Sequence, residues 1–338
     1  MDEGSNTVLT FFGLREQPFA ATADPAFFCA TREYKECLFR LWNTIDDRHG
    51  IAVILGHYGT GKTTLLRKLL TGMRAKPDRY NTAVIASPIP SWTSFSLLEA
   101  LVSQFGLQPP KRSFITYMES LYRYLLAQRS RINTLIIDDA QNLNKRGQLE
   151  LLRLVQNLET PQHKLLNLAF FAQLEWMPVL RAAPNFEQRI SMAYTLGPLS
   201  EEETRRLIEY RLRQAGAGSR GPLFEDGALR VIHAFAEGSP RVTVTLCRNA
   251  LLLAAQLKSQ RITQAVILHT IQKTTLPDAQ KNARIAAVLK NGVDETVPAL
   301  TPPPEQPFPL HTAVGDAREE RANRLLRNAA KRQAHGME

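Results

Sequence analysis

The sequence predicts an α/β fold, in which a parallel β-sheet covered by helices on both faces is followed by a smaller all-helical domain. Apolar runs rich in β-branched or aromatic residues recur through residues 45–199, and segments with helical periodicity separate them. Residues 200–272 contain no such run. The chain has 338 residues and is 44% hydrophobic, which is enough apolar side chain to build sizeable cores.

Five segments are expected to form the sheet. Most of them are continuously apolar, which is typical of parallel strands buried on both faces. Their alternation with helical segments predicts right-handed crossover connections. The expected strands are 51–55, 82–87, 134–138, 165–172 and, with a weaker pattern, 192–197, and the expected helices between them are 62–74, 94–105, 113–129 and 146–158.

The helical domain shows recognisable start and stop signals. Ser200 and Glu203 form a capping-box pattern, Gly238 marks a helix end, and Thr263 marks a helix start. We therefore expect an N-terminal extension, an α/β domain, a smaller helical domain and a tail, over residues 1–44, 45–199, 200–275 and 276–338.

The tail is expected to be partly disordered. Residues 297–309 are Pro-rich, which favours extended or disordered chain. Residues 317–334 regain helical spacing and place Arg or Lys every three or four residues. Such a stripe is either a solvated helix face or a peptide that docks on nucleic acid or on a protein partner.

Charge and cysteine content limit the compartment and the partners. The chain has 42 Lys+Arg against 32 Asp+Glu, a net charge of +10, which favours a polyanionic partner. No apolar run approaches the roughly 20 residues of a bilayer span, and the N-terminus lacks a signal-peptide pattern. Cys29, Cys37 and Cys247 form no CxxC motif, which suits a reducing compartment. We expect a cytoplasmic protein with no membrane segment.

Residues 56–64, GHYGTGKTT, match the phosphate-loop pattern G-x-x-x-x-G-K-[ST] between an expected strand and an expected helix. The glycines allow backbone N–H groups to surround phosphate oxygens, and the helix N-terminus adds positive partial charge. We expect Lys62 to reach the β- and γ-phosphates of ATP and the Thr63 hydroxyl to bind Mg²⁺. The predicted nucleotide-binding residues of this loop are Gly56, His57, Tyr58, Gly59, Thr60, Gly61, Lys62, Thr63 and Thr64.

The segment 135-LIIDDAQNL-143 is an apolar strand that ends in two carboxylates, as the second half of a phosphate-loop site requires. Asp138 is expected to hold Mg²⁺ through water and Asp139 to orient the attacking water. Gln173, at the end of the fourth strand, is placed to touch the γ-phosphate.

Two arginine positions are expected to complete the site. Arg189 is the candidate arginine finger that acts on a neighbouring subunit, with Arg181 as the alternative. In 238-GSPR-241, a glycine ends one helix and Arg241 begins the next, so Arg241 can bring positive charge onto the nucleotide.

Several motifs in a fixed order resemble the ExeA-type AAA+ ATPases. They are an aromatic-rich stretch over 11–34, the phosphate loop, the LIIDDAQNL segment, 150-ELLRLVQNLET-160, 188-QRI-190, 196-LGPLSEEETRRLIEYRL-212 and GSPR. The resemblance covers roughly residues 8–272. This group is similar to the transposition regulators TnsC, TniB and MuB. The resemblance implies an AAA+ P-loop NTPase with a five-stranded parallel sheet in the order 5-1-4-3-2 and a helical lid.

The same resemblance implies an ATPase that assembles as a ring or helical filament, with ATP and Mg²⁺ at subunit interfaces. Gln173 would then be the first sensor, Arg241 the second, and Arg189 or a neighbour the arginine that acts in trans. The implied partners are duplex DNA bound without sequence preference, a transposase, and a target-selector protein.

Two departures from the family pattern bear on activity. The family has Glu directly after the Asp of the second motif, whereas this chain has Asp139, which is one methylene shorter. A misplacement of about 1 Å of a catalytic group can cost much of the rate, so hydrolysis is expected to be slow. ExeA also carries a transmembrane helix and a peptidoglycan-binding region after its ATPase, and no counterpart of either is recognisable here.

Two loop pairs are the candidate DNA contacts, because they match DNA-facing loops of TnsC-like filaments. They are Lys111 with Arg112, and Lys145 with Arg146, expected on the same side of the sheet. Solvated loops would look the same.

The first functional hypothesis is therefore an ATP-dependent DNA-binding regulator of transposition that acts in target-site selection. The second is a cytoplasmic assembly ATPase of a secretion or pilus system that does not bind DNA, and the third is a nucleotide switch without hydrolysis. Length-dependent, salt-sensitive affinity for duplex DNA separates the first from the second.

Overall fold

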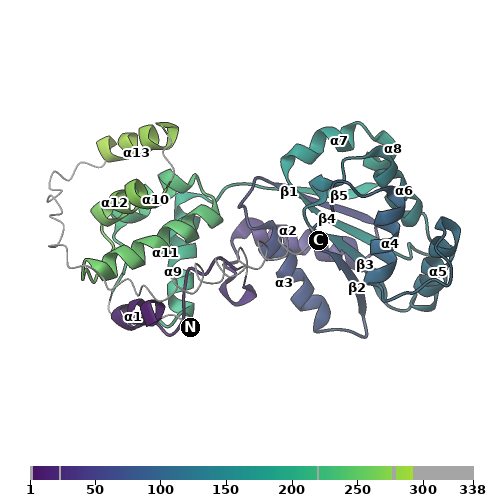
Figure 1. Cartoon of the computed structure of the whole chain (residues 1–338), viewed down its shortest axis with the longest axis horizontal. Helices are drawn as coiled ribbons and strands as arrows, with labels where there is room; N and C mark the ends of the chain where they lie inside the picture. Colours follow the sequence, from purple (N-terminus) through teal and green to yellow (C-terminus); the bar gives the residue numbers. More distant parts are fainter. Residues whose placement is uncertain (1–2, 23, 219–220, 276–278, 292–338) are drawn as a thin grey trace, which may run out of the picture. The chain divides into compact units, whose positions relative to one another are not determined.

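Five parallel strands form one sheet in the order β2-β3-β4-β1-β5 in the computed structural model, which describes residues 3–22, 24–218, 221–275 and 279–291 (Figure 1). This is the predicted order 5-1-4-3-2 read from the other edge, so the α/β prediction is confirmed. The strands are β1 (Ile51–Gly56), β2 (Tyr80–Ile85), β3 (Ile132–Ile137), β4 (Asn167–Ala172) and β5 (Ile190–Leu196).

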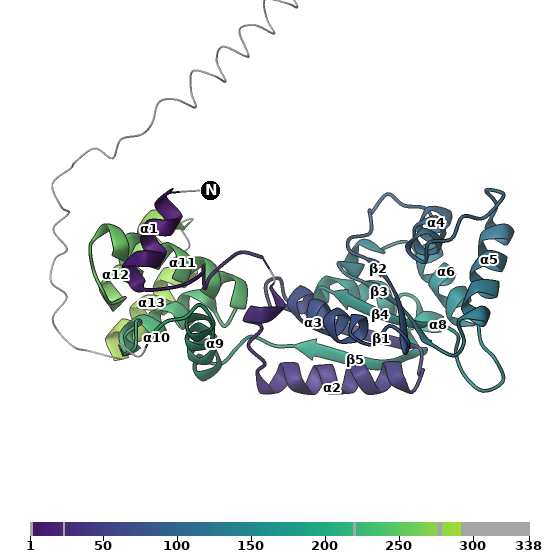
Figure 2. The same ribbon diagram turned by 90° about the horizontal axis from the view of Figure 1, so that it is seen from below.

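Helices cover both faces of the sheet, which explains why the central strands are mainly apolar. Val53 and Leu55 of β1 belong to a core shared with α4, α5 and α6, whereas Ala52 and Ile54 belong to a second core shared with α2 and α3. Figure 2 shows these two sets of helices flanking the sheet. Their bounds are α2 (Arg32–Asp46), α3 (Lys62–Arg74), α4 (Ser94–Gln104), α5 (Phe114–Ala127) and α6 (Arg146–Gln156), and two short helices, α7 (Met177–Arg181) and α8 (Pro184–Glu187), precede β5.

Buried asparagines join neighbouring strands near their starts. Asn81 of β2 pairs with Asn133 of β3 in the sheet register, and its Nδ2 donates to Asn133 Oδ1 at 2.7 Å. Asn133 Nδ2 donates to the Leu165 carbonyl oxygen at 3.0 Å, and Asn167 Nδ2 donates to the Ile45 carbonyl oxygen at 3.0 Å. These amides are paired inside an apolar core, so they favour one strand alignment over others.

A separate helical group follows β5. The capping box of Ser200 and Glu203 is present, and Thr263 Oγ1 accepts the Val266 N–H at 3.3 Å, so both predicted helix starts are confirmed. Val8 of α1 (Glu3–Phe12) is buried in the core of this group. The group comprises α9 (Glu201–Gln214), α10 (Asp226–Ala236), α11 (Pro240–Gln256), α12 (Gln264–Thr274) and α13 (Ala279–Asn291).

The helical group continues past residue 275, where the sequence pattern suggested that it ends. Ile285 of α13 is 5% exposed and belongs to the same core as α10 and α11. Helix α2 was also not anticipated, and it crosses the expected boundary between residues 44 and 45. The Pro-rich segment 297–309 and the basic stripe 317–334 lie outside the described residues. Within the described ranges, no helix has the length and apolarity that a membrane crossing requires.

Candidate nucleotide site

The phosphate loop occupies the turn between β1 and α3, as the sequence predicts. Gly59 and Gly61 have φ values of +82° and +89°, in the left-handed region that favours glycine. A Cβ atom on Gly56 would lie 2.7 Å from Thr60 Oγ1, so this glycine is also required by packing. Helix α3 begins at Lys62, directly after the loop, so its N-terminal partial positive charge lies at the loop.

Lys62 is 8% exposed and has only neutral partners in this loop. Its Nζ donates to the carbonyl oxygens of Gly56 at 2.7 Å and His57 at 2.9 Å. Burial lowers the pKa of Lys62, and the charges of Asp138 and Asp139 oppose that shift. A buried ammonium held by carbonyl oxygens would gain from an anionic ligand, and phosphate oxygens fit that requirement.

The two motifs meet through Thr63 and Asp138. The Thr63 hydroxyl donates to Asp138 Oδ2 at 2.9 Å, although 75 positions separate the two residues in sequence. Burial raises the pKa of Asp138, while the hydrogen bonds from Thr63 and from the Asp139 N–H oppose the shift. A hydroxyl and a carboxylate at this separation are oxygen ligands of the type that Mg²⁺ prefers.

Asp139 and Gln173 are brought together through Gln141, which the sequence analysis did not single out. Asp139 has a φ of +49°, an uncommon left-handed conformation for a residue with a side chain. Its Oδ1 accepts a hydrogen bond from Gln141 Nε2 at 3.1 Å. Gln141 Oε1 in turn accepts the Gln173 backbone N–H at 3.1 Å. The Gln141 amide therefore links the end of β4 to the carboxylate after β3.

The start of α11 contacts the tip of the phosphate loop. The Arg241 N–H donates to the Gly59 carbonyl oxygen at 3.3 Å, and the Arg241 guanidinium carbon lies 4.7 Å from the centre of the Tyr58 ring. The preceding Gly238 has a φ of +71°, and its carbonyl oxygen accepts the Leu199 N–H at 2.9 Å. Arg241, which the sequence predicts to bring positive charge onto the nucleotide, therefore lies beside the phosphate loop, and its role there stays a prediction.

An apolar hollow beside the loop was not anticipated as a site. Tyr34 of α2 donates from its hydroxyl to the Thr60 carbonyl oxygen at 2.6 Å and stacks on Phe28 with ring centres 5.5 Å apart. The aromatic-rich stretch over 11–34 was the signal available in the sequence. The hollow is lined by residues of that stretch, of the phosphate loop and of the helical group, among them Phe28, Cys29, Tyr34, Gly61, Leu207 and Pro240.

The two candidate arginine fingers, Arg189 and Arg181, lie away from the phosphate loop of their own chain. Arg189 directly precedes β5, and β5 runs parallel to β1, so Arg189 lies at the sheet edge opposite the phosphate loop. Its Nη1 donates to Asn157 Oδ1 at 2.5 Å and lies 3.4 Å from Gln156 Oε1. Arg181 is exposed at the end of α7. Neither arginine joins the phosphate loop of its own chain.

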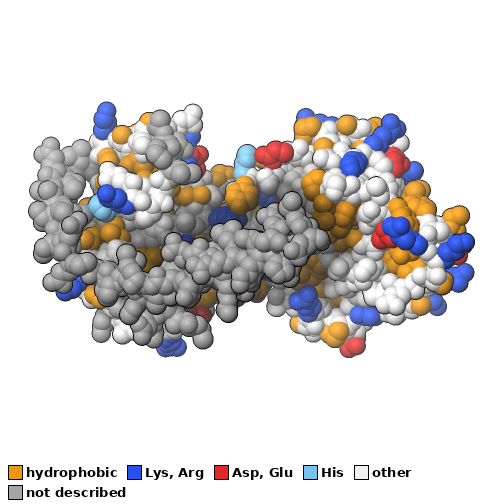
Figure 3. Space-filling model, viewed as in Figure 1, with side chains coloured by type: hydrophobic (Ala, Val, Ile, Leu, Met, Phe, Trp, Pro, Cys, Tyr) orange, Lys and Arg blue, Asp and Glu red, His pale blue; other side chains and the backbone are white. Residues whose placement is uncertain are grey.

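The two candidate DNA-binding pairs lie around the start of α4. Arg112 forms an ion pair with Glu99 of α4 at 2.6 Å, and Lys145 Nζ donates to the carbonyl oxygens of Ser91 and Trp92 at 3.0 and 3.1 Å. Lys111 and Arg146 are exposed. Figure 3 shows Lys and Arg side chains spread over the visible face and not gathered in one patch.

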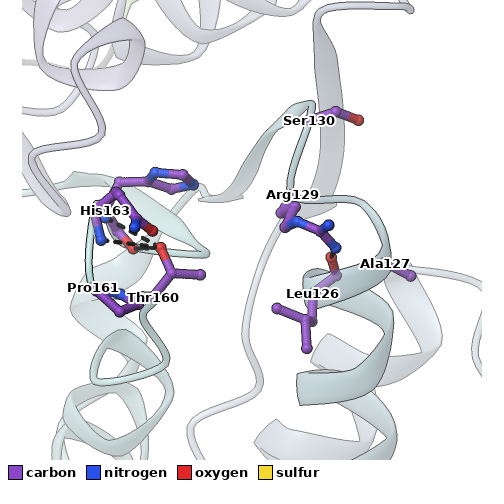
Figure 4. Close-up of a pocket in the computed structure, with 8 residues that line it drawn as sticks. Leu126, Ala127, Arg129, Ser130, Thr160, Pro161 and His163 are labelled. Carbon is purple, nitrogen blue, oxygen red and sulfur yellow. Dashed lines mark hydrogen bonds between the residues drawn. The ribbon is translucent and has the colours of Figure 1, made fainter.

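A second hollow, of about 520 Å³, lies at the sheet edge where β3 and β4 begin (Figure 4). Arg129 Nη1 donates there to the Leu126 carbonyl oxygen at 3.3 Å, and Thr160 Oγ1 lies 3.3 Å from the His163 carbonyl oxygen. None of the functional-site residues predicted from the sequence lines this hollow. The predicted site residues of the phosphate loop instead lie at the opposite edge, where the strands end.

Comparison with known proteins agrees with the fold and the loop. Residues 45–180 match the family model described as an AAA domain. Over 257 residues the chain is 34% identical to "General secretion pathway protein A" of Aeromonas hydrophila, which covers 75% of this chain and 46% of that protein. The chain thus spans about half the length of this curated relative.

Two solved structures with a similar fold are a Cdc6p and an ORC protein. A Cdc6p from Pyrobaculum aerophilum has a TM-score of 0.59 at 17% identity, covering 76% of this chain and 73% of that chain. Drosophila ORC bound to DNA has a TM-score of 0.56 at 17% identity, covering 82% of this chain and 68% of that chain. At these identities the similarity establishes the fold. The phosphate loop, the sheet order and the matched family model together show that residues 45–180 form an AAA domain with the P-loop NTPase fold, and the chain is similar over its matched part to General secretion pathway protein A.

Proposed function

We propose that the loop binds MgATP, with Lys62 on the β- and γ-phosphates and with Thr63 and Asp138 on the magnesium ion. The 2.9 Å hydrogen bond between Thr63 and Asp138 carries this proposal, because it brings the hydroxyl and carboxylate ligands to one point. The residues also fit the ligand electrostatically. Burial destabilises both the Lys62 ammonium and the Asp138 carboxylate, and a phosphate and a divalent cation would stabilise them.

Asp139 is the proposed water-orienting residue. MgATP, when bound, supplies the phosphoryl group that is transferred. The Asp139 carboxylate would orient the attacking water and take up its proton, while Gln141 keeps the carboxylate in place through the 3.1 Å hydrogen bond. Gln173 would contact the γ-phosphate from the end of β4. The side chain of Asp139 is shorter than Glu, which favours slow turnover.

We propose further that Arg189 acts on the nucleotide of a neighbouring subunit. Its place at the opposite sheet edge excludes a role on the phosphate loop of its own chain. The amide oxygens of Asn157 and Gln156 hold its guanidinium without neutralising its charge. This arrangement supports a ring or filament in which each subunit completes the site of the next one.

The partner proposed first is duplex DNA, in an ATP-dependent role as a target-selecting regulator of transposition that recruits a transposase. The net charge of +10 and the two loop pairs around α4 support DNA contact. Arg112 and Lys145 are engaged within the protein, so Lys111 and Arg146 are the side chains proposed to reach phosphates. Contacts of this kind would be independent of sequence.

The test is binding of labelled duplexes of two lengths, with a slowly hydrolysed ATP analogue and over a range of salt concentrations. Affinity should rise with length and fall with salt, and electron microscopy should show rings or filaments on the DNA. Lys111→Ala and Arg146→Ala should each lower the salt slope by about 1, whereas Lys76→Ala, an exposed loop lysine, should not. DNA affinity that is unaffected by nucleotide, or no DNA affinity at all, would refute the DNA proposal.

The second candidate is an assembly ATPase of a secretion system. The 34% identity to General secretion pathway protein A favours it. In that case the same binding experiment would give no DNA affinity, while nucleotide binding and oligomer formation would persist. Lys62→Ala should remove nucleotide binding and assembly in either case, which separates a failed partner proposal from a failed ATP proposal.

A further inference from the structure

Arg211 of α9 (Glu201–Gln214) has a buried guanidinium whose Nε–H has no acceptor. It is 8% exposed, and its Nη1 donates to the Pro18 carbonyl oxygen at 3.0 Å. The guanidinium carbon lies 5.6 Å from the centre of the Phe27 ring. Its Nε atom is buried and has no hydrogen-bond partner, and within the described residues Arg211 forms no ion pair.

Burying the Arg211 guanidinium in this way lowers the stability of the fold. Burial lowers the pKa of Arg211, which means that the surrounding structure disfavours its charge. An unpaired buried donor adds the desolvation cost of a polar atom that has lost its water. The contacts to Pro18 and Phe27 use one nitrogen and one face of the guanidinium and leave the Nε–H unused. An acceptor from outside the chain would satisfy it.

The position of Arg211 indicates what kind of acceptor that is. Arg211 lines the apolar hollow beside the phosphate loop, together with Phe28, Tyr34, Gly61 and Leu207. A ligand whose phosphates lie on Lys62 would extend its other end toward this hollow. Aromatic and aliphatic walls suit a flat heterocycle that carries few polar atoms at fixed positions. The hollow is narrow, about 40 Å³, so a ring enters it only as α9 and the segment before α2 separate.

We infer that Arg211 is a specificity-determining residue for the nucleotide base, and that its Nε–H donates to a ring nitrogen of adenine. The inference rests on the proposed binding of ATP at the phosphate loop. Because a guanidinium only donates hydrogen bonds, it requires an acceptor edge on the base. Adenine offers such acceptors at N1, N3 and N7. The base would thus contact the helical group through Arg211 of α9, while the phosphates would contact Lys62 beside the sheet.

The experiment is calorimetric binding of ATP, of 1-deaza-, 3-deaza- and 7-deaza-ATP, and of inorganic tripolyphosphate, each with magnesium. For the unmodified protein, one deaza analogue should bind about tenfold or more weakly than ATP, the amount expected for one hydrogen bond from a charged donor. The other two analogues should bind like ATP. Three deaza analogues that all match ATP would overturn the inference without any variant.

Variants of Arg211 test the same contact from the protein side. Arg211→Met keeps an apolar stem of similar length and should lose about tenfold in ATP affinity, with no change for tripolyphosphate. It should also bind all three deaza analogues and ATP alike. Arg213→Met, at an exposed position on the same helix, is the matched control and should behave as the unmodified protein does.

Each remaining outcome also decides the question. ATP affinity unchanged in Arg211→Met would overturn the role of Arg211. If that variant does not fold, as a thermal melt would show, Arg211→Lys keeps the charge and the stem and should still lose the discrimination against one analogue. Absence of both ATP and tripolyphosphate binding to the unmodified protein would instead refute the ATP proposal itself.

Discussion

The hydroxyl of Tyr34 lies where a side chain on Gly61 would begin. A Cβ atom on Gly61 would be 2.7 Å from Tyr34 Oη, and that hydroxyl donates to the Thr60 carbonyl oxygen at 2.6 Å. Residue 34, from a helix that precedes the sheet, therefore fixes the backbone of the phosphate loop. The glycine of the nucleotide motif is required here by a neighbouring side chain as well as by its own φ value.

Tyr34→Phe should destabilise the protein and loosen the loop. Burial raises the pKa of Tyr34, so its hydroxyl remains a donor throughout the neutral range. Removing that donor leaves the Thr60 carbonyl oxygen unpaired, at a cost of about 1–3 kcal/mol. Calorimetry should show a lower Tm, and ATP affinity should fall. Tyr122→Phe, which alters an exposed tyrosine, is the control and should leave both unchanged; equal Tm values for the two variants would contradict the role of Tyr34.

Asp138→Asn should raise the stability of the nucleotide-free protein at pH 7. The fold raises the pKa of this carboxyl by burial, so the stability that the carboxyl contributes is present at low pH and is lost as pH rises through its folded pKa. The ionised form at pH 7 therefore costs stability, and an amide avoids that cost. Melting curves should show a gain at pH 7 that shrinks as pH falls toward the ordinary aspartate pKa of 3.8.

The same variant should lose the stabilisation that MgATP gives, because the carboxylate ligand is gone. Asp78→Asn, at an exposed loop position, provides the comparison and should show neither effect. A Tm below that of the unmodified protein at pH 7 would show that the buried carboxylate supports the fold after all.

Substitutions at Asp139 should separate binding from turnover. Asp139→Asn removes the carboxylate that the proposal assigns to water activation, so hydrolysis should fall at least tenfold while ATP affinity stays within about twofold. Asp139→Glu restores the longer side chain and should raise turnover. Phosphate release and calorimetric titration measure the two quantities, and hydrolysis that survives in Asp139→Asn would remove Asp139 from the mechanism.

Tyr58 should compete with the nucleotide for Arg241. Tyr58 is 64% exposed and Lys62 is buried, and the Arg241 guanidinium lies over the Tyr58 ring. We expect a phosphate held by Lys62 to draw the guanidinium away from that ring. Loss of the cation–π contact, worth about 0.5–1 kcal/mol, should make Tyr58→Leu bind ATP about two- to fivefold more tightly. Tyr58→Phe keeps an aromatic ring and should bind ATP normally. In an Arg241→Ala background the difference between leucine and tyrosine at this position should vanish.

The sheet could be predicted from the sequence because its physical cause is local. Strands buried on both faces must be mainly apolar, and β1, β3 and β4 are, apart from buried polar residues near the starts of β3 and β4. The phosphate loop could be predicted for a similar reason, since the glycines, Lys62 and Thr63 are adjacent in the chain. The strand order, by contrast, came from a family resemblance and not from residue periodicity.

The contacts between distant segments could not be predicted in this way. The aromatic-rich stretch that ends at residue 34 is visible in the sequence, but no local pattern indicates that Tyr34 and Arg211 line one hollow at the phosphate loop. Helix α13 is not evident from the sequence because few of its side chains reach the helical core, namely Ile285 and the partly buried Leu289. Gln141 has no sequence signal for a related reason, because its two hydrogen bonds link the segment after β3 to the end of β4, far apart in the chain.

The paired asparagines at the strand starts have a consequence for catalytic alignment. If the pairing of β2 and β3 shifted by one residue, Asn81 would face a residue other than Asn133. The hydrogen bond between the two amides would then be lost inside an apolar core. The same shift would displace the carboxylates after β3 by about 3.3 Å, which is the rise of one strand residue. A register shift would therefore cost hydrogen bonds at the starts of the strands, and the same shift would misplace the carboxylates at their ends. The asparagine pair thus favours the strand alignment that the nucleotide site requires.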